Sequence, residues 1–111
     1  MGIRDEINGR SDDFSKLCSS NKVKELYAFG SSVTDQFDPA SSDIDLLVDI
    51  DTSDPMEKGE ALITLWDEFE SFFKRKIDLL TNSSIKNPIL RKNIDNTKIL
   101  IYDGKRKKVL I

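Results

Sequence analysis

Residues 43–51, with the sequence DIDLLVDID, restrict the possible folds of this chain more than any other segment. Successive side chains of a β-strand point to opposite faces of a sheet. One face of such a strand carries only apolar side chains, those of Ile44, Leu46, Val48 and Ile50. The other face carries Leu47 and the carboxylates of Asp43, Asp45, Asp49 and Asp51. The strand therefore needs a hydrophobic core on one side, and on the other a cation or basic partner, because carboxylates so close together repel one another.

The rest of the chain predicts helices and strands in alternation. A long amphipathic helix begins at Pro55, with Ser53 or Asp54 as its cap. Its apolar positions follow the helical period, and we expect its aromatic side chains in the core; they are Leu62, Leu65, Trp66, Phe69, Phe72 and Phe73.

Shorter elements complete the pattern. Helices are predicted over residues 3–20, over residues 31–37 and after Asn87-Pro88, and strands over residues 23–29, 76–80 and 98–102. This order predicts an α/β (α+β) fold with helices packed on a sheet. A length of 111 residues predicts a single domain spanning 1–111, with its core over about residues 23–102.

Composition excludes several kinds of chemistry. The chain has no histidine, so a histidine general base or a catalytic triad that depends on one is excluded. The single cysteine, Cys18, cannot form an internal disulfide or a multi-cysteine metal centre. With 17 Lys and Arg against 20 Asp and Glu, the net charge of −3 gives no reason to expect strong nucleic-acid binding. Catalysis would depend on carboxylates, hydroxyls, basic side chains and a hard metal ion.

The sequence also indicates a compartment. No apolar run approaches the roughly 18–20 residues of a membrane span, so no membrane association is expected. The first ten residues lack the apolar stretch of a signal peptide, and Cys18 is unpaired, so we expect a cytoplasmic protein. The basic cluster 105–108 is interpreted as a solvated tail, with a patch that contacts phosphate or a partner as the alternative.

Three features together point to phosphate and metal chemistry. Gly30-Ser31 lies at a predicted strand-to-helix turn, where glycine allows close backbone approach to an anion and helix N–H groups can bind it. Asp43 and Asp45 share one strand face, and Asp78 lies on another predicted strand. Carboxylates in this number can bind one or two Mg²⁺ ions together with phosphate oxygens. Each feature alone is also common in proteins without such a site, because Gly-Ser turns are frequent and an Asp-x-Asp pair often lies in a loop.

Three motifs in sequence order resemble the minimal nucleotidyltransferases of the DNA polymerase β-like superfamily, the family of stand-alone MntA-type antitoxins. They are residues 29–32 (FGSS), 42–48 (SDIDLLV) and 76–80 (KIDLL). The resemblance extends over about residues 23–102 and implies a small mixed sheet flanked by helices.

The resemblance also implies a role for each matching residue. Nucleotide binding falls to the first motif, at Gly30, Ser31 and Ser32. Asp43 and Asp45 are implied as ligands of Mg²⁺. Asp78 is implied as a ligand of a second Mg²⁺ ion and as an aid to deprotonation of the acceptor hydroxyl. All three aspartates are thereby implied as catalytic and metal-binding residues.

The implied activity is adenylyl transfer. Members of this family resemble enzymes that transfer AMP from ATP to a tyrosine on a HEPN-domain toxin encoded nearby, and so act as antitoxins. A second interpretation is a catalytically weak or inactive module that neutralises a toxin by occlusion. A third is a structural scaffold whose carboxylates are surface charge.

Two departures from the family pattern concern the phosphate side of the site. The spacer from Ser31 to Asp43 is one residue longer than is usual, with the extra residue in the loop over 38–42. Many relatives carry an arginine shortly after the Gly-Ser pair, where this chain has Ser32-Val33-Thr34. Lys74, Arg75 and Arg91 are the cations that could replace it.

Overall fold

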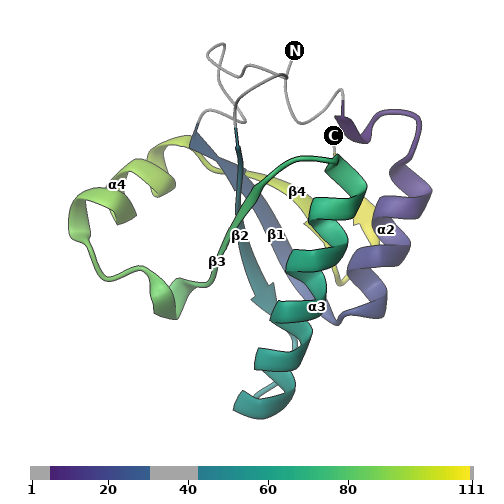
Figure 1. Cartoon of the computed structure of the whole chain (residues 1–111). Coiled ribbons are helices and arrows are strands. Elements are labelled where there is room, and N and C mark those ends of the chain that lie inside the picture. Colours follow the sequence, from purple (N-terminus) through teal and green to yellow (C-terminus); the bar gives the residue numbers. More distant parts are fainter. Residues whose placement is uncertain (1–5, 31–42, 111) are drawn as a thin grey trace.

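A mixed five-stranded sheet forms the centre of the protein (Figure 1), whose computed structural model describes residues 6–30 and 43–110. In chain order the elements are α2 (Ser11–Ser20), β1 (Val23–Phe29), β2 (Ile44–Ile50), α3 (Pro55–Phe73), β3 (Ile77–Leu80), the 3₁₀ helix η2 (Asn82–Ser84), α4 (Pro88–Thr97), β4 (Ile99–Asp103) and β5 (Lys108–Val109). The predicted fold class, a small mixed sheet flanked by helices, is confirmed.

The strand order is β3-β2-β1-β4-β5, with β3 and β5 at the edges. Only β2 and β3 run parallel, and they do so because α3 carries the chain back across the sheet between them. The parallel register sets Asp45 opposite Asp78. On its other side Asp45 pairs with Phe29, the last residue of β1. The topology thus brings three separate motifs of the sequence to adjacent positions at one end of the sheet.

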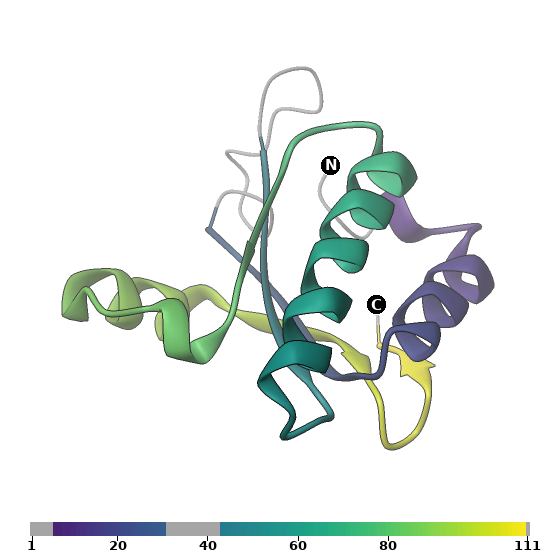
Figure 2. The ribbon, with the colours of Figure 1, turned by 60° about the horizontal axis from the view of Figure 1, so that its bottom comes forward.

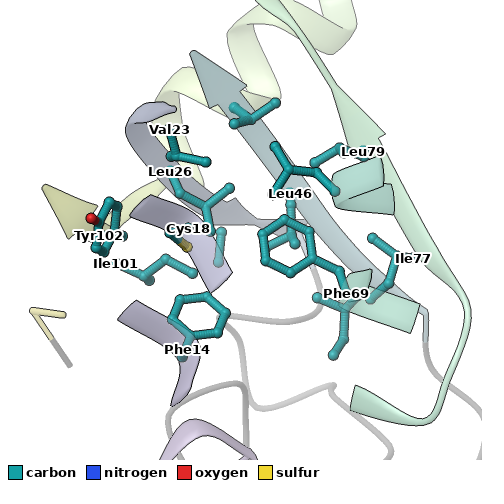
Figure 3. Packing of buried hydrophobic residues seen from close by; sticks show 14 of the residues in the cluster. Phe14, Cys18, Val23, Leu26, Leu46, Phe69, Ile77, Leu79, Ile101 and Tyr102 are labelled. Carbon is teal, nitrogen blue, oxygen red and sulfur yellow. The ribbon is translucent and has the colours of Figure 1, made fainter. Parts of the chain in front are cut away.

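The main core lies between one face of the sheet and the helices α2 and α3 (Figures 2 and 3). The alternating apolar residues of β2 all belong to it, as their period-two pattern predicts; they are Ile44, Leu46, Val48 and Ile50. The rings of Phe14 on α2 and Phe69 on α3 stack with their centroids 5.8 Å apart. This packing fixes β2 in the sheet and therefore fixes where its carboxylates point.

The opposite face of the sheet carries a smaller apolar cluster near α4. Leu47 is only 1% exposed and packs there with Phe29, Ile85 and Ile94. The prediction that this face of β2 presents mainly carboxylates is therefore incomplete, because α4 covers part of it. The carboxylate of Asp45 lies on this second face beside an apolar patch.

Capping residues explain where the two later helices begin. Asp54 caps α3, since its Oδ1 accepts a hydrogen bond from the Met56 N–H at 3.0 Å. Asn87 caps α4 in the same way, and a proline follows each cap. The predicted helix over residues 3–20 is interrupted at Gly9, whose φ of 84° ends the first turn before α2 begins. The helix predicted over 31–37 lies outside the described residues.

Two further predictions need correction. The basic cluster 105–108 is exposed, as a solvated segment should be, but it is not a tail, because it forms the turn into β5, and Lys108 pairs with Asp103 of β4. Trp66 is not a core residue: it is 37% exposed, and its Nε1–H donates to the carbonyl oxygen of Ile77 at 2.8 Å. Among the described residues, no helix is long and apolar enough to cross a membrane.

Candidate functional site

The structure places Asp45 and Asp78 side by side on the second face of the sheet. Asp45 is partly buried between β1 and β3, whereas Asp78 is exposed on the edge strand. Burial raises the pKa of the Asp45 carboxyl to about 6, and the charges of Asp78 and Asp43 and a hydrogen bond with Asp78 add to the shift. The site therefore concentrates negative charge where one carboxylate is poorly solvated, which is the electrostatic condition that a bound cation relieves.

Gly30 closes the site on the side of β1. Its φ of 66° lies in the left-handed region that favours glycine. A Cβ atom at this position would lie 2.7 Å from Oδ2 of Asp45, so any larger residue would displace that carboxylate. The Gly30 N–H donates to Oγ1 of Thr97 at 3.2 Å. That N–H group is thus engaged within the protein.

Of the remaining predicted site residues, the structure describes Asp43 but not Ser31 or Ser32. Asp43 directly precedes β2, is partly buried and is close enough for its charge to raise the pKa of Asp45. Ser31 and Ser32 lie outside the described residues. Asp78 takes part in none of the salt bridges found among the described residues, so no ion pair with the nearby Lys74 or Lys76 is seen there.

The carboxylates of the site suit an Mg²⁺ ion that takes its other ligands from water and a nucleotide. Within residues 6–30 and 43–110, no three acidic or cysteine side chains are grouped so as to hold a metal ion by themselves. Mg²⁺ is commonly held by one or two carboxylates, with water and substrate phosphates completing its octahedron. Asp45 and Asp78 supply such a pair, and the mutual repulsion that raises the pKa of Asp45 is consistent with a cation between them. The chemistry of this pair fits an ion shared with a nucleotide.

Two of the three cations proposed for phosphate contact, Arg91 and Arg75, have other partners in this structure. Arg91 donates to Oδ1 and to the backbone oxygen of Asn82, at 2.9 Å and 3.0 Å. Arg75 forms an ion pair with Glu6 at 2.9 Å. Lys74 is exposed at the C-terminal cap of α3, with a left-handed backbone. Of the three, Lys74 is the one whose side chain is most accessible to solvent.

Sequence reasoning missed the residues that position the site from outside it. Thr97, the last residue of α4, holds the backbone of Gly30. Trp66 and Glu70 of α3 both contact Ile77, the residue before Asp78: Trp66 donates to its oxygen, and Oε2 of Glu70 accepts from its N–H at 3.5 Å. No local pattern identifies such residues, because their partners are distant in sequence. Only the spacing of Trp66 on α3 indicated that it faces the sheet.

Known proteins resemble this chain in sequence. The family described as Polymerase beta, Nucleotidyltransferase matches residues 13–107. The Methanocaldococcus jannaschii protein named "Putative protein adenylyltransferase MJ0126" is 35% identical over 86 residues, which cover 78% of this chain and 84% of that protein.

Two solved structures share the fold. A crystal structure of a toxin–antitoxin with AMP-PNP aligns with a TM-score of 0.59 at 24% identity, over 87% of this chain and 76% of the other. A structure described as a "putative minimal nucleotidyltransferase" aligns with a TM-score of 0.60 at 20% identity, over 89% of this chain and 95% of the other. At these identities the two structures support the fold, while the sequence matches support the family.

Proposed function

The chain belongs to the polymerase β nucleotidyltransferase family, and from this premise we propose that it transfers AMP from ATP to a hydroxyl group of a partner protein. The observation that carries the proposal is the pairing of Asp45 with Asp78 across parallel strands, with Gly30 against the Asp45 carboxylate. A partly buried carboxylate beside an exposed one is suited to different tasks. The first can hold a cation firmly, and the second can reach an incoming acceptor.

In the proposed reaction the acceptor oxygen attacks the α-phosphorus of ATP. The new P–O bond forms as the bond from the α-phosphorus to the bridging oxygen of the β-phosphate breaks, and pyrophosphate leaves. The hydroxyl proton passes to the Asp78 carboxylate, which is exposed and can release it to water. Gly30 lets the Asp45 carboxylate lie directly against the backbone, in a place from which a side chain at position 30 would displace it.

Mg²⁺ is the cofactor proposed for this site. Asp45 and Asp78 would hold it, with Asp43 near enough to contribute its charge. When bound, Mg²⁺ neutralises the triphosphate and lowers the pKa of a coordinated hydroxyl. Two ions are the number that the family resemblance implies. Ser31 and Ser32 are proposed to bind the phosphates together with Gly30.

The proposed acceptor is a tyrosine on a HEPN-type toxin encoded nearby, which makes this protein an antitoxin. A relative named as a protein adenylyltransferase supports a protein acceptor. The fold shared with a chain of a toxin–antitoxin structure that contains AMP-PNP supports the kind of partner and the adenine nucleotide. We propose that the protein acts in the cytoplasm as a single domain.

The decisive experiment uses the purified protein, α-labelled ATP, Mg²⁺ and the product of the neighbouring gene. Wild type should label the neighbour, and the Asp45→Asn, Asp78→Asn double variant should not. The Asp49→Asn variant is the matched control, since Asp49 lies on the same strand, four residues from Asp45, and is outside the proposed site. If the two proteins co-elute without label transfer, the protein acts by occlusion, and the catalytic proposal is wrong for that pair.

A further inference from the structure

The outer face of α3 carries an apolar stripe that the fold leaves exposed. Met56 is 76% exposed, Ile63 is 74% exposed and Trp66 is 37% exposed. With Gly59 these residues follow the 3-4-3 spacing of one helix face. The inner face of the same helix already fills the core through Leu65, Phe69 and Phe73. The stripe is therefore a second apolar face, which the core of this protein does not explain.

Two residues of the stripe, Trp66 and Gly59, have features that favour contact with a partner. Trp66 is held by the hydrogen bond from its Nε1–H to the oxygen of Ile77, so its ring is fixed before any partner arrives. Gly59 has no heavy atom within 4 Å of the position of a Cβ, so the fold does not require a glycine there. A glycine inside a helix costs stability, and its lack of a side chain lets another backbone approach closely. Tryptophan is enriched among the residues that dominate the binding energy of protein interfaces, so Trp66 is suited to anchor a docked helix.

Charge on α3 limits what can occupy the stripe. The helix carries five acidic residues and one basic residue, namely Glu57, Glu60, Asp67, Glu68, Glu70 and Lys58. Glu60 and Asp67 are exposed and border the stripe. A second copy of this chain would bring the same acidic border against itself, which is repulsive. A helix with basic flanks would be attracted.

We propose that the stripe docks an amphipathic helix of a partner protein, with apolar residues at its centre and Lys or Arg on both flanks. This proposal rests on the proposed function in one respect, because it assigns the surface to the protein that carries the acceptor hydroxyl. Trp66 bonds to Ile77, and the next residue is Asp78 on the edge strand. A helix on the stripe thus lies beside the edge strand β3, and because the Asp78 carboxylate points to the opposite face of that strand, the partner would reach the site around the edge of the sheet.

The test uses Trp66 as a reporter, since it is the single tryptophan of the chain. The probe is a synthetic helical peptide without tryptophan, with Leu at its seam positions and Lys on both flanks, titrated without nucleotide. Binding should shift the Trp66 emission to the blue and weaken with added salt. Ile63→Arg should weaken binding roughly tenfold or more. Ile89→Arg is the matched control, because Ile89 is 80% exposed on α4 and lies outside the stripe.

Each outcome decides the proposal. A blue shift that Ile63→Arg abolishes and Ile89→Arg retains supports it, and loss of binding in both variants or in neither overturns it. A concentration-dependent dimer of the wild-type protein that Ile63→Arg dissociates would assign the stripe to a second copy instead. Because no nucleotide is present, the Asp45→Asn variant should bind the probe like wild type. Failure of adenylyl transfer with intact docking therefore contradicts only the proposed function.

Discussion

Gly30 and Asp45 approach so closely that a single methyl group on Gly30 would lie 2.7 Å from the Asp45 carboxylate oxygen Oδ2. The contact joins the end of β1 to the start of β2, and the antiparallel register that pairs Phe29 with Asp45 sets it. The positive φ of Gly30 would disfavour a side chain even without the contact. Two separate physical requirements for glycine thus coincide next to the most perturbed carboxylate of the site.

Replacing Gly30 with alanine separates these two requirements. Gly30→Ala should lower the free energy of unfolding by about 1–3 kcal/mol and reduce adenylyl transfer, because the Asp45 carboxylate must move. Gly9→Ala is the control, since Gly9 also has a positive φ but nothing within 4 Å of its Cβ position. Urea unfolding of both variants measures the difference. Equal losses of stability, with activity intact in Gly30→Ala, would show that the contact with Asp45 is unimportant.

The ionised Asp45 carboxylate, which the proposed site needs, should lower the free energy of unfolding. Burial and nearby carboxylates raise its pKa from 3.8 to about 6, so the folded protein binds this proton more tightly than the unfolded chain does. The ionised carboxylate therefore destabilises the fold, fully above pH 6 and not at all below about pH 4. Asp45→Asn should raise the free energy of unfolding at pH 7.5 by about 1 kcal/mol, a figure reduced for partial solvation, with no gain at pH 4.

Chemical denaturation across this pH range checks the prediction. Asp49→Asn, on the same strand, should change stability by less than about 0.5 kcal/mol at either pH. A pH-independent effect of Asp45→Asn would contradict the electrostatic explanation.

Binding of Mg²⁺ and ATP should depend on pH through the same group. Since the pKa of Asp45 is about 6, a ligand that requires the carboxylate must displace a proton near that pH. Affinity should rise from pH 5 to pH 7 and then level off. Calorimetry at pH 6 in buffers of different ionisation enthalpy should detect release of about half a proton. Asp45→Asn should release none, and a flat affinity between pH 5 and pH 7 would count against this role.

Substitution of Asp78 should affect adenylyl transfer much more than it affects stability. It is exposed on an edge strand, so Asp78→Asn should change stability by less than about 0.5 kcal/mol. The same change should lower adenylyl transfer at least about a hundredfold, because the exposed carboxylate takes the proton of the acceptor. Asp49→Asn should retain transfer. Labelling rates measured with both variants, beside thermal unfolding, test the prediction, and near-normal transfer by Asp78→Asn would exclude it.

Local sequence patterns predicted most elements of this fold correctly. The strand over 23–29 and the helix that begins at Pro55 match the structure, because β-branched residues, period-two or helical spacing and capping residues act over a few positions. β5 was missed, since a strand of two residues, one of them in the basic cluster, carries no strand pattern of its own. Trp66 was misplaced because helical spacing alone does not say how far a residue lies from the core centre.

The candidate site was identified from motifs, but its geometry was not. The sequence placed Asp43, Asp45 and Asp78 on strands and gave the reason why carboxylates there need a cation. It could not predict that Asp45 is partly buried and Asp78 exposed, since that depends on which strand is at the edge. It also gave no sign that Thr97 binds the Gly30 N–H, because the two residues meet only after α4 has folded back.

The sequence by itself determined that β2 buries one face and presents carboxylates on the other, because side-chain alternation is a local property of an extended chain. Tertiary structure alone decided that Asp45 lies opposite Asp78, that Leu47 is buried under α4 and that Gly30 touches the Asp45 carboxylate. These relationships depend on strand register and helix placement. Both are fixed by how the whole core packs, since a one-residue slip would turn every side chain of β2 to the opposite face.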